Sequence, residues 1–361
     1  MYSRECEILI KCRGTPPMAD RVTSSQVAQR AGVSQSAVSR VYTPGASVSL
    51  KTKDKVRKAA SELGYRPNVL ARAMVSGKSR IIGLVVAYLE NYFYPEAVEK
   101  FSNALQARGY HVMMFMASQT ATDIDNVMEE ILDYQVDGII MASAEMSSVL
   151  SKRCRAAGVP VVLFNRSQDI AGTSAVISDN VAGGRRVAEL FAAAGHTRIG
   201  YIAGWEGAST QRDREAGFMA GLNAAGQTLF TRKVGNFDFD VAKQAAIDMF
   251  SCPAKQRPDA VFVANDHMAI AVMDVLRQQL GLSVPADVSV VGFDDVPPAS
   301  WAAYNLTTVR QRANLMVEKT VSTLLHQLTH PTSPVQQHTI DCPLILRESA
   351  RIPEGWNDER I

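Results

Sequence analysis

The stretch from residue 35 to residue 40 carries side chains that could read a nucleic acid. Its hydrogen-bonding residues, on the outer face of a predicted short helix that presents no acid there, are Gln35, Ser36, Ser39 and Arg40. Such a face suits the DNA major groove, where Gln can pair with adenine, Arg with guanine or a phosphate, and Ser with either kind of group. The alternative is a small helical hairpin that only packs. It would explain the neighbouring valines, but not a polar face free of acids.

Two short helices and a glycine turn position this face. Thr23 and Gln26 form a capping box for the first helix. Gly32 ends that helix, because glycine adopts a left-handed turn without steric cost. Ser34 then caps the second helix. A third helix, over about residues 50–63, is capped by Ser49. Its exposed cations at positions 51, 53, 55, 57 and 58 favour phosphate contact, although a solvated charged face is the alternative.

From residue 80 onward the pattern alternates between strands and amphipathic helices. Continuous apolar runs rich in β-branched residues are typical of parallel strands buried on both faces. They cover residues 81–86, 111–116, 138–141, 161–164, 175–178, 199–203, 260–264 and 289–293. Several helices end at a glycine just before a strand, at Gly109, Gly195 and Gly226. The recurrence in both halves predicts two similar doubly wound lobes.

Ligands of doubly wound lobes bind at the carboxyl ends of the strands, so the polar residues there are candidates for a binding cleft. They fall in residues 91–94, 165–166, 209–218, 265–266 and 294–295. Residues 91–94 include aromatic rings that could stack on a sugar or a base. An Arg fork with Asn and Asp acceptors suits a polyhydroxylated ligand. Arg166 adds a positive charge near the cleft, which leaves a sugar acid or a phosphorylated sugar open as the ligand.

Length and composition describe a globular protein of several domains. The 361 residues exceed one ordinary core, and 47% of them are hydrophobic. No apolar run approaches the roughly 20 residues of a membrane span, and the first residues lack a secretory signal, so we expect a cytoplasmic protein. The five cysteines are scattered and read as ordinary thiols. Neither catalytic motifs nor trusted metal-ligand spacings occur, so we expect no enzyme activity, cofactor or metal.

The charge is unevenly distributed along the chain. The net charge is +2, but residues 21–80 hold twelve Lys and Arg against two acids, while residues 1–20 are neutral. The remaining 281 residues therefore carry a net −8. A basic head on an acidic body is the outline of a DNA-binding domain joined to a body that does not bind DNA.

Residues 22–83 resemble the DNA-binding headpiece of the lac repressor (LacI/GalR) family of bacterial transcription regulators. The runs that carry the resemblance are Val22-Thr23, Val27-Ala28, Ala31-Gly32-Val33-Ser34, Val38-Ser39-Arg40-Val41, Val48-Ser49, Leu63-Gly64-Tyr65, Pro67-Asn68 and Ile82-Gly83. The rest of the chain also fits the family, to about residue 350. The resemblance implies an α/β fold with an N-terminal all-α helix-turn-helix headpiece and two doubly wound α/β lobes of the periplasmic-binding-protein type.

The expected domain boundaries follow from these patterns and from the resemblance. Residues 1–20 form an extension, 21–67 the headpiece, 68–79 a hinge helix or linker, and 80–361 the effector-binding and dimerisation domain. Lobe 1 takes about 80–178 and 311–340, and lobe 2 about 179–310 and 341–352. Residues 1–17 fit no pattern; we interpret Met18 as the true start, the alternative being a real disordered tail.

The resemblance also implies site residues. Thr23, Ser39, Ser49 and Thr52 match phosphate-contacting positions, and Met74 stands where the family wedges an apolar side chain, commonly Leu, into the minor groove. The expected DNA-binding set is Thr23, Gln35, Ser36, Ser39, Arg40, Ser49, Thr52, Asn68 and Met74. Residues 69–77 match the family's hinge helix, with a plain linker as the alternative.

For the effector, Arg214, Asn265 and Asp294 match ligand-contacting positions of the family, and Phe237 stands where an aromatic ring often covers the ligand. The expected effector-binding set is Tyr92, Phe93, Asn165, Thr210, Arg214, Phe237, Asn265 and Asp294. Each has a structural alternative. Asp294 could cap a helix, Asn265 could hold a loop, and Tyr92 and Phe93 could belong to the core.

The function expected is that of a dimeric repressor that reads a pseudo-palindromic operator and responds to a sugar or a sugar derivative. Two alternatives stay open. One is a carbohydrate-binding protein without a regulatory role, against which the basic headpiece argues. The other is a regulator controlled by a protein partner.

Overall fold

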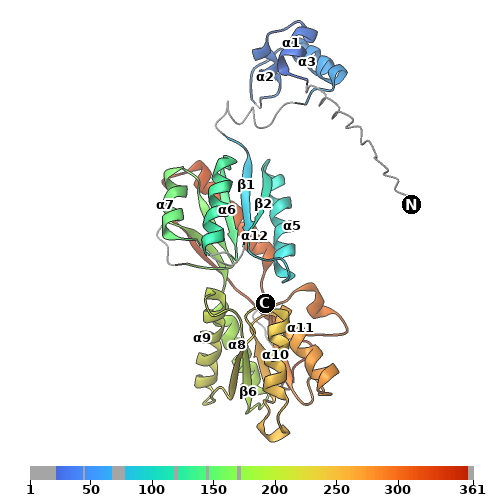
Figure 1. The fold of residues 1–361 in the computed structure, drawn as a ribbon, viewed down its shortest axis with the longest axis vertical. Helices are drawn as coiled ribbons and strands as arrows, with labels where there is room; N and C mark the ends of the chain where they lie inside the picture. The colour runs from blue at the N-terminus through green and yellow to red at the C-terminus, as the bar shows by residue number, and fades with distance from the viewer. Residues whose placement is uncertain are drawn as a thin grey trace, which may run out of the picture. The chain divides into compact units, whose positions relative to one another are not determined.

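The chain divides into two units, Met1–Ser79 and Arg80–Ile361. The structure is a computed structural model that describes residues 22–43, 45–66, 78–117, 121–143, 146–168 and 172–356 (Figure 1). The predicted extension, most of the predicted linker, and with them Asn68 and Met74, lie outside the described residues. The domain boundaries drawn from the sequence therefore stay a prediction.

The first unit is a small all-helical headpiece. Its helices are α1 (Ser24–Ala31), α2 (Gln35–Val41) and α3 (Leu50–Leu63). Val27, Val38 and Val56, one from each helix, are fully buried and meet in its core. Few apolar residues are available in so short a segment, so the helix caps contribute a large share of the local order.

Each predicted cap of the headpiece is confirmed. The Thr23 hydroxyl accepts from the backbone N–H of Gln26, whose side chain accepts in return from the Thr23 N–H at 2.8 Å. Gly32 ends α1 in the left-handed conformation, with φ 63°. Ser34 and Ser49 cap α2 and α3 through their hydroxyl groups. These local contacts fix where α2 begins, and so which of its side chains face outward.

Lobe 1 contains a six-stranded parallel sheet of order β11-β5-β4-β3-β1-β2. Its strands are β1 (Ile81–Val86), β2 (His111–Met116), β3 (Gly138–Ala142), β4 (Val161–Phe164), β5 (Ser174–Ser178) and β11 (Gln337–Ile340), and its helices are α5 (Phe93–Gln106), α6 (Ala121–Asp133), α7 (Ser148–Ala156) and α12 (Ala313–Thr329). Side chains of β1 alternate between two cores. Leu84 packs with residues of α5 and α12, whereas Val85 packs with residues of α6 and α7. Helices therefore cover both faces of the sheet.

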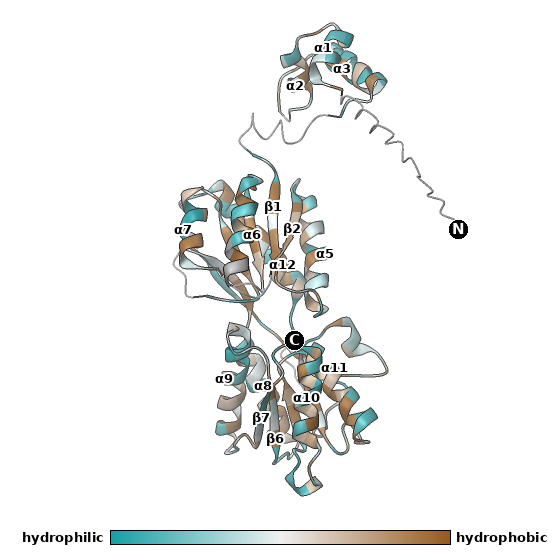
Figure 2. Ribbon diagram, viewed as in Figure 1, coloured by the Kyte–Doolittle hydropathy of each residue, from teal (hydrophilic) through white to brown (hydrophobic). Residues whose placement is uncertain are grey.

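Lobe 2 repeats this plan, with the order β12-β10-β9-β8-β6-β7. Its strands are β6 (Ile199–Ala203), β7 (Thr231–Val234), β8 (Ala260–Val263), β9 (Ser289–Asp294), β10 (Thr307–Arg310) and β12 (Leu344–Ile345), and its helices are α8 (Asn180–Ala193), α9 (Ser209–Ala224), α10 (Phe239–Phe250) and α11 (Asp266–Asp274). Short helical turns lie at η1 (Ala254–Gln256), η2 (Val275–Gln279) and η3 (Pro297–Ser300). All strand pairs are parallel except β10 with β12. Figure 2 shows apolar strands in both lobes and polar residues along the outer helices.

The eight predicted strands are present to within one residue at each end. One expectation is wrong: β2 is not buried on both faces. It forms the edge of the lobe 1 sheet, and its side chains at Met114 and Met116 are 46% and 48% exposed. Four further strands were not predicted: β7, β10 and β11 contain no continuous apolar run, and β12 has only two residues.

Helices α8 and α9 pack unusually closely. A Cβ atom on Gly217 would lie 1.9 Å from the carbonyl oxygen of Val181, and one on Gly184 would lie 2.1 Å from that of Arg214. Any side chain at these positions would meet backbone, which cannot swing aside as a side chain can. This contact therefore fixes the position of α9, the helix that carries Arg214.

We predict that Gly217→Ala destabilises lobe 2 by about 2–3 kcal/mol, because overpacking against backbone forces the two helices apart. Urea unfolding followed by tryptophan fluorescence reports on this lobe through Trp205 and Trp301. Ala216→Ser, at an exposed position of the same helix, should change stability by less than about 0.5 kcal/mol. Equal midpoints for the two variants would contradict the packing argument.

Candidate functional site

The outward face of α2 carries the polar residues expected to read DNA. Gln35, Ser36, Ser39 and Arg40 are all exposed, whereas Val38 between them is fully buried. The Gln35 amide donates to the Ser24 hydroxyl at 3.0 Å, which ties the start of α2 to the start of α1. The Ser34 and Ser36 hydroxyls are 2.9 Å apart and share a hydrogen bond. The face is therefore presented on a fixed helix with two side chains already oriented.

Three of the four expected phosphate contacts lie at helix N-termini, and the fourth, Ser39, lies on the exposed face of α2. Thr23 and Ser49 cap α1 and α3, and Thr52 lies in the first turn of α3, where its hydroxyl is 2.9 Å from that of Ser49. Helix N-termini present unpaired N–H groups and a partial positive charge, which favours phosphate. Lys51 and Lys55 of α3 are exposed and add full charges. The headpiece thus combines a polar reading face with cationic positioning groups.

We predict that Gln35→Ala changes the base preference at one position of each half-site, with a loss of about 1–3 kcal/mol, because a base-reading amide is removed. Lys55→Ala is the matched control. It should weaken binding to all DNA sequences alike and lower the slope of log affinity against log salt concentration by about one. Fluorescence anisotropy with single-base operator variants measures both effects. If Gln35→Ala instead lost the same affinity for every operator variant, Gln35 would contact the DNA backbone and not a base.

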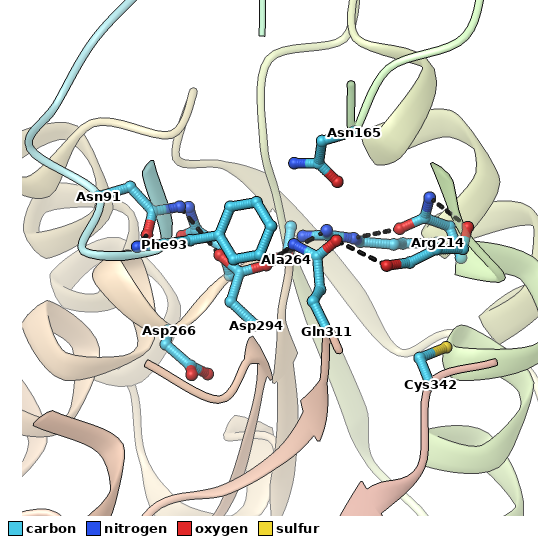
Figure 3. Close-up of polar contacts among 12 residues, drawn as sticks. Asn91, Phe93, Asn165, Arg214, Ala264, Asp266, Asp294, Gln311 and Cys342 are labelled. Carbon is cyan, nitrogen blue, oxygen red and sulfur yellow. Dashed lines mark hydrogen bonds and ion pairs between the residues drawn. The ribbon is translucent and has the colours of Figure 1, made fainter. Parts of the chain in front are cut away.

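In the second unit, a buried ion pair forms the centre of the candidate ligand site. Arg214, on α9, and Asp294, at the end of β9, are 2% and 3% exposed, and their nearest charged atoms are 3.3 Å apart. The Arg214 guanidinium also donates to the Asn180 side chain at 2.9 Å and to the Ala264 carbonyl at 2.5 Å. Its Cζ atom lies 3.6 Å from the centre of the Phe293 ring. The arginine is thereby held in one orientation (Figure 3).

Asp294 accepts hydrogen bonds from both lobes. The Asn91 amide, which follows β1 in lobe 1, donates to one carboxylate oxygen at 2.9 Å. The Gln311 amide, on a segment between the lobes, donates to the other at 2.7 Å, and Gln311 itself accepts from the Ser178 hydroxyl. Burial raises the pKa of Asp294, whereas the Arg214 charge and these donors lower it. Figure 3 shows Asn91, Gln311 and Arg214 around this carboxylate.

Strained backbone marks the same edge of each sheet. Ser143, Asn165 and Phe237, which follow β3, β4 and β7, have φ angles of 62°, 67° and 59°. Asp294 and Asp295 have φ angles of 123° and 57°. Residues other than glycine rarely adopt this left-handed backbone conformation. Those that do often cluster at functional sites, where the surrounding structure holds them. The surrounding structure therefore holds these strand ends in an unfavourable backbone conformation, which makes them candidates for ligand binding.

The expected effector residues occupy different kinds of position. Asn165 is buried, and its amide donates to the Tyr94 hydroxyl at 3.1 Å. Thr210 is buried in the first turn of α9. Phe237 is 6% exposed and packs against Gly204. These three lie at strand or helix ends, as a ligand site requires, and their contacts with an effector stay a prediction.

Structural roles are present at two of these positions, Asn265 and Phe93. Asn265 caps α11 through its side-chain oxygen, a structural role other than the loop-holding one considered from the sequence, and its amide nitrogen is buried without a partner among the described residues. Phe93 belongs to the lobe 1 core, where its ring stacks on Phe164 at 5.9 Å. It also borders a cavity of about 470 Å³ beside Asp294. Tyr92 is 48% exposed. Both aromatic residues remain only candidates for ligand contact.

Several residues of this network were missed. Asn91 was noted only within an aromatic run, and Gln311 only as a place where the chain crosses between lobes. Asn180 and Phe293 gave no signal, because each acts through a partner distant in the sequence. Asp266, next to Asn265, is also central. Its carboxyl group is fully buried, 2.6 Å from the Thr308 hydroxyl, and accepts from the Val296 N–H at 3.0 Å.

Burial raises the pKa of Asp266 from its ordinary 3.8 to about 8, and the nearby Asp294 charge adds to this effect. The folded protein therefore retains a proton that the unfolded chain releases above pH 4. The stability from this group is full below about pH 4 and is lost as the pH rises through 8. We predict that Asp266→Asn gains stability relative to the parent between pH 5 and pH 8. Urea unfolding across that range measures it, and a constant difference would contradict the assignment.

The geometry so far describes a helix-turn-helix unit with a cationic face and a two-lobed α/β unit with a polar centre. Together they define a ligand-responsive DNA-binding regulator. Comparison with known proteins agrees. Residues 25–68 match the model for bacterial regulatory proteins of the lacI family. Residues 188–350 match the model for a periplasmic binding protein-like domain.

Similar proteins extend over most of the chain. The ribose operon repressor of Escherichia coli (strain K12) is 32% identical over 330 residues, which are 90% of this chain and 98% of that protein. The lac repressor dimer bound to operator and the anti-inducer ONPF has a TM-score of 0.82, with 28% identity over 91% of this chain and 99% of that one. The complex of the regulator CelR with cellobiose has a TM-score of 0.68 at 30% identity, over 91% and 100%. The chain belongs to the lacI family of bacterial regulatory proteins.

The helices, possible metal ligands and cysteines of the described residues bear on other kinds of function. None of the helices in the described ranges is long and apolar enough to cross a bilayer. Among those same residues, no three His, Cys, Asp or Glu side chains are grouped so that they could hold a metal ion. Cys154, Cys252 and Cys342 are free thiols. His326 and His330 stack at the end of α12 with ring centres 4.5 Å apart.

Proposed function

We propose that this protein is a dimeric transcriptional repressor whose operator affinity is controlled by a small hydroxylated ligand bound between lobes 1 and 2. The ligand is a sugar or a sugar derivative, and the protein acts on it by binding, without catalysis. Such a regulator works in the bacterial cytoplasm, where its operator lies. Two relatives support this ligand class: the name of one includes ribose, and the solved structure of the other is a complex with cellobiose.

The observation that carries the ligand class is a set of buried polar atoms without partners. Of the eleven such atoms in the part of the chain that the structure describes, three lie just after strands of the two sheets: Ser143 Oγ and Asn165 Oδ1 in lobe 1, and Asn265 Nδ2 in lobe 2. Each residue is 3% exposed or less. Leaving such groups unpaired costs about 1–3 kcal/mol each. They follow β3, β4 and β8, at the strand ends where ligands bind, and sugar hydroxyls can both donate to and accept from them.

Control of DNA binding follows from differential affinity. A ligand held by groups from both lobes binds the closed arrangement more tightly than an open one, and so shifts the population between them. Because lobe 1 directly follows the headpiece segment in the chain, a change in lobe arrangement can alter how paired headpieces are presented to DNA. The coupling is reciprocal, so operator DNA changes ligand affinity by the same factor.

The exposed edge of lobe 1 supports the dimer. Met114 and Met116 of β2 leave an apolar edge strand uncovered, and such strands are usually paired or covered. The similar lac repressor structure is a dimer on its operator. A two-fold pair of headpieces reads a pseudo-palindromic site, one half-site for each subunit.

We predict that Arg214→Ala keeps operator binding in the absence of ligand and abolishes the response to ligand, because it removes the fixed donor at the centre of the site. Selection of bound duplexes from a random pool first provides the operator, and a screen of sugars against that duplex provides the response. Arg232→Ala, which breaks ion pairs to Glu206 and Glu215 nearer the surface of lobe 2, is the control and should respond normally. If Arg214→Ala responded to ligand like the parent, the ligand site would lie elsewhere. If the selected duplexes shared no two-fold symmetric motif, the proposal of a pseudo-palindromic operator would be contradicted.

A further inference from the structure

Arg166 is a buried cation that pairs with no acid among the described residues. It follows β4 directly and is only 3% exposed. None of the ion pairs or hydrogen bonds among the described residues involves its guanidinium, and its Nε atom is enclosed without any partner. In the described part of the chain, its guanidinium instead lies over the Trp205 ring, whose centre is 5.3 Å from Cζ. Arg214, in contrast, has its charge balanced by Asp294.

Among the described residues, no carboxylate pairs with Arg166. The charges of Arg166 and Asp294 both act on the Tyr88 hydroxyl, but Asp294 is already paired with Arg214. Burial raises the pKa of the neighbouring Tyr88 hydroxyl, so that group is uncharged. A buried charge without a partner is unfavourable, and proteins avoid it unless a ligand completes the site. The five N–H donors of a guanidinium match the oxygens of a carboxylate or a phosphate.

A second group of donors lies beside Arg166. The backbone N–H of the next residue, Ser167, donates to the Ser209 hydroxyl at 3.1 Å, and Ser209 begins α9. The residue before that helix is Ala208, whose methyl side chain cannot accept a hydrogen bond from the first N–H groups of the helix. The sixteen-residue helix α9 therefore presents an uncapped, partly positive end next to an unpaired guanidinium. Both features favour one anionic group at the same place.

We propose that the effector carries a carboxylate or a phosphate, which binds between the Arg166 guanidinium and the first turn of α9. This inference rests on the proposed function, since it names the ligand class of the same site. Arg166 comes from lobe 1, and Trp205 and α9 come from lobe 2. An anion held there contacts both lobes and stabilises their closed arrangement. The sugar hydroxyls then lie toward Asn165 and Asn265.

The test compares neutral and acidic forms of the same sugars on the full chain. The probes are ribose with ribose 5-phosphate, glucose with gluconate and glucose 6-phosphate, and inorganic phosphate, all at constant ionic strength. The thermal midpoint is measured for the parent protein, Arg166→Gln, the charge-retaining Arg166→Lys, and Arg185→Gln. Arg185 is exposed on α8 and makes no side-chain hydrogen bond or ion pair among the described residues, so it controls for loss of charge alone.

We expect at least one acidic probe to raise the midpoint of the parent and of Arg185→Gln. The affinity should fall about 10- to 100-fold in Arg166→Gln, the range expected for a charged hydrogen bond, and recover in part in Arg166→Lys. Equal shifts in the parent and Arg166→Gln, or the absence of any Arg166-dependent shift, would overturn the inference. If a neutral sugar alone then weakens operator binding, the proposed function stands and only the anionic class fails.

Discussion

The buried pair of Arg214 and Asp294 is the interaction on which the second unit depends. Two charges that are nearly inaccessible to water are stable only when their hydrogen-bonding capacity is met. The fold meets it with Asn180, the Ala264 carbonyl and the Phe293 ring around the arginine. The ends of β8 and β9 and two helices of lobe 2 therefore converge on one point. Without Arg214, Asp294 would lose its charge partner, and burial, which already raises the pKa of Asp294, would favour the neutral form of that carboxyl group.

The same pair links the lobes. Asp294 belongs to lobe 2, yet one of its donors is Asn91 of lobe 1 and another is Gln311 between the lobes. A ligand that enters this network must compete with or extend those hydrogen bonds, so its binding and the lobe arrangement are coupled. The unpaired cation at Arg166 lies at a second place where the lobes meet, beside the Ser167–Ser209 contact. Binding and closure thus share the same few contacts.

Local patterns made much of this structure predictable. Caps at Thr23, Ser34 and Ser49 depend on neighbours three residues away, and apolar β-branched runs identify buried strands wherever they occur. The polar edge strand β7 gave no such signal, and the exposure of β2 depends on which strand is its neighbour. Asn91 and Gln311 could not be recognised, because their importance comes from Asp294, about 200 and 17 residues away in the sequence. Arg166 was visible as a charge, but its lack of a partner is a property of the fold.

The measurement that tests the central claim most directly is the distance between the lobes when the Asp294 network is weakened. Spin labels are placed at the exposed residues Gln106 of lobe 1 and Gln244 of lobe 2. Pulsed electron paramagnetic resonance then measures the distance between the labels in the parent and in Asn91→Ala. The account predicts one dominant short distance in the parent and a broader, longer distribution in the variant. Identical distributions would contradict the claim that Asp294 holds the two lobes together.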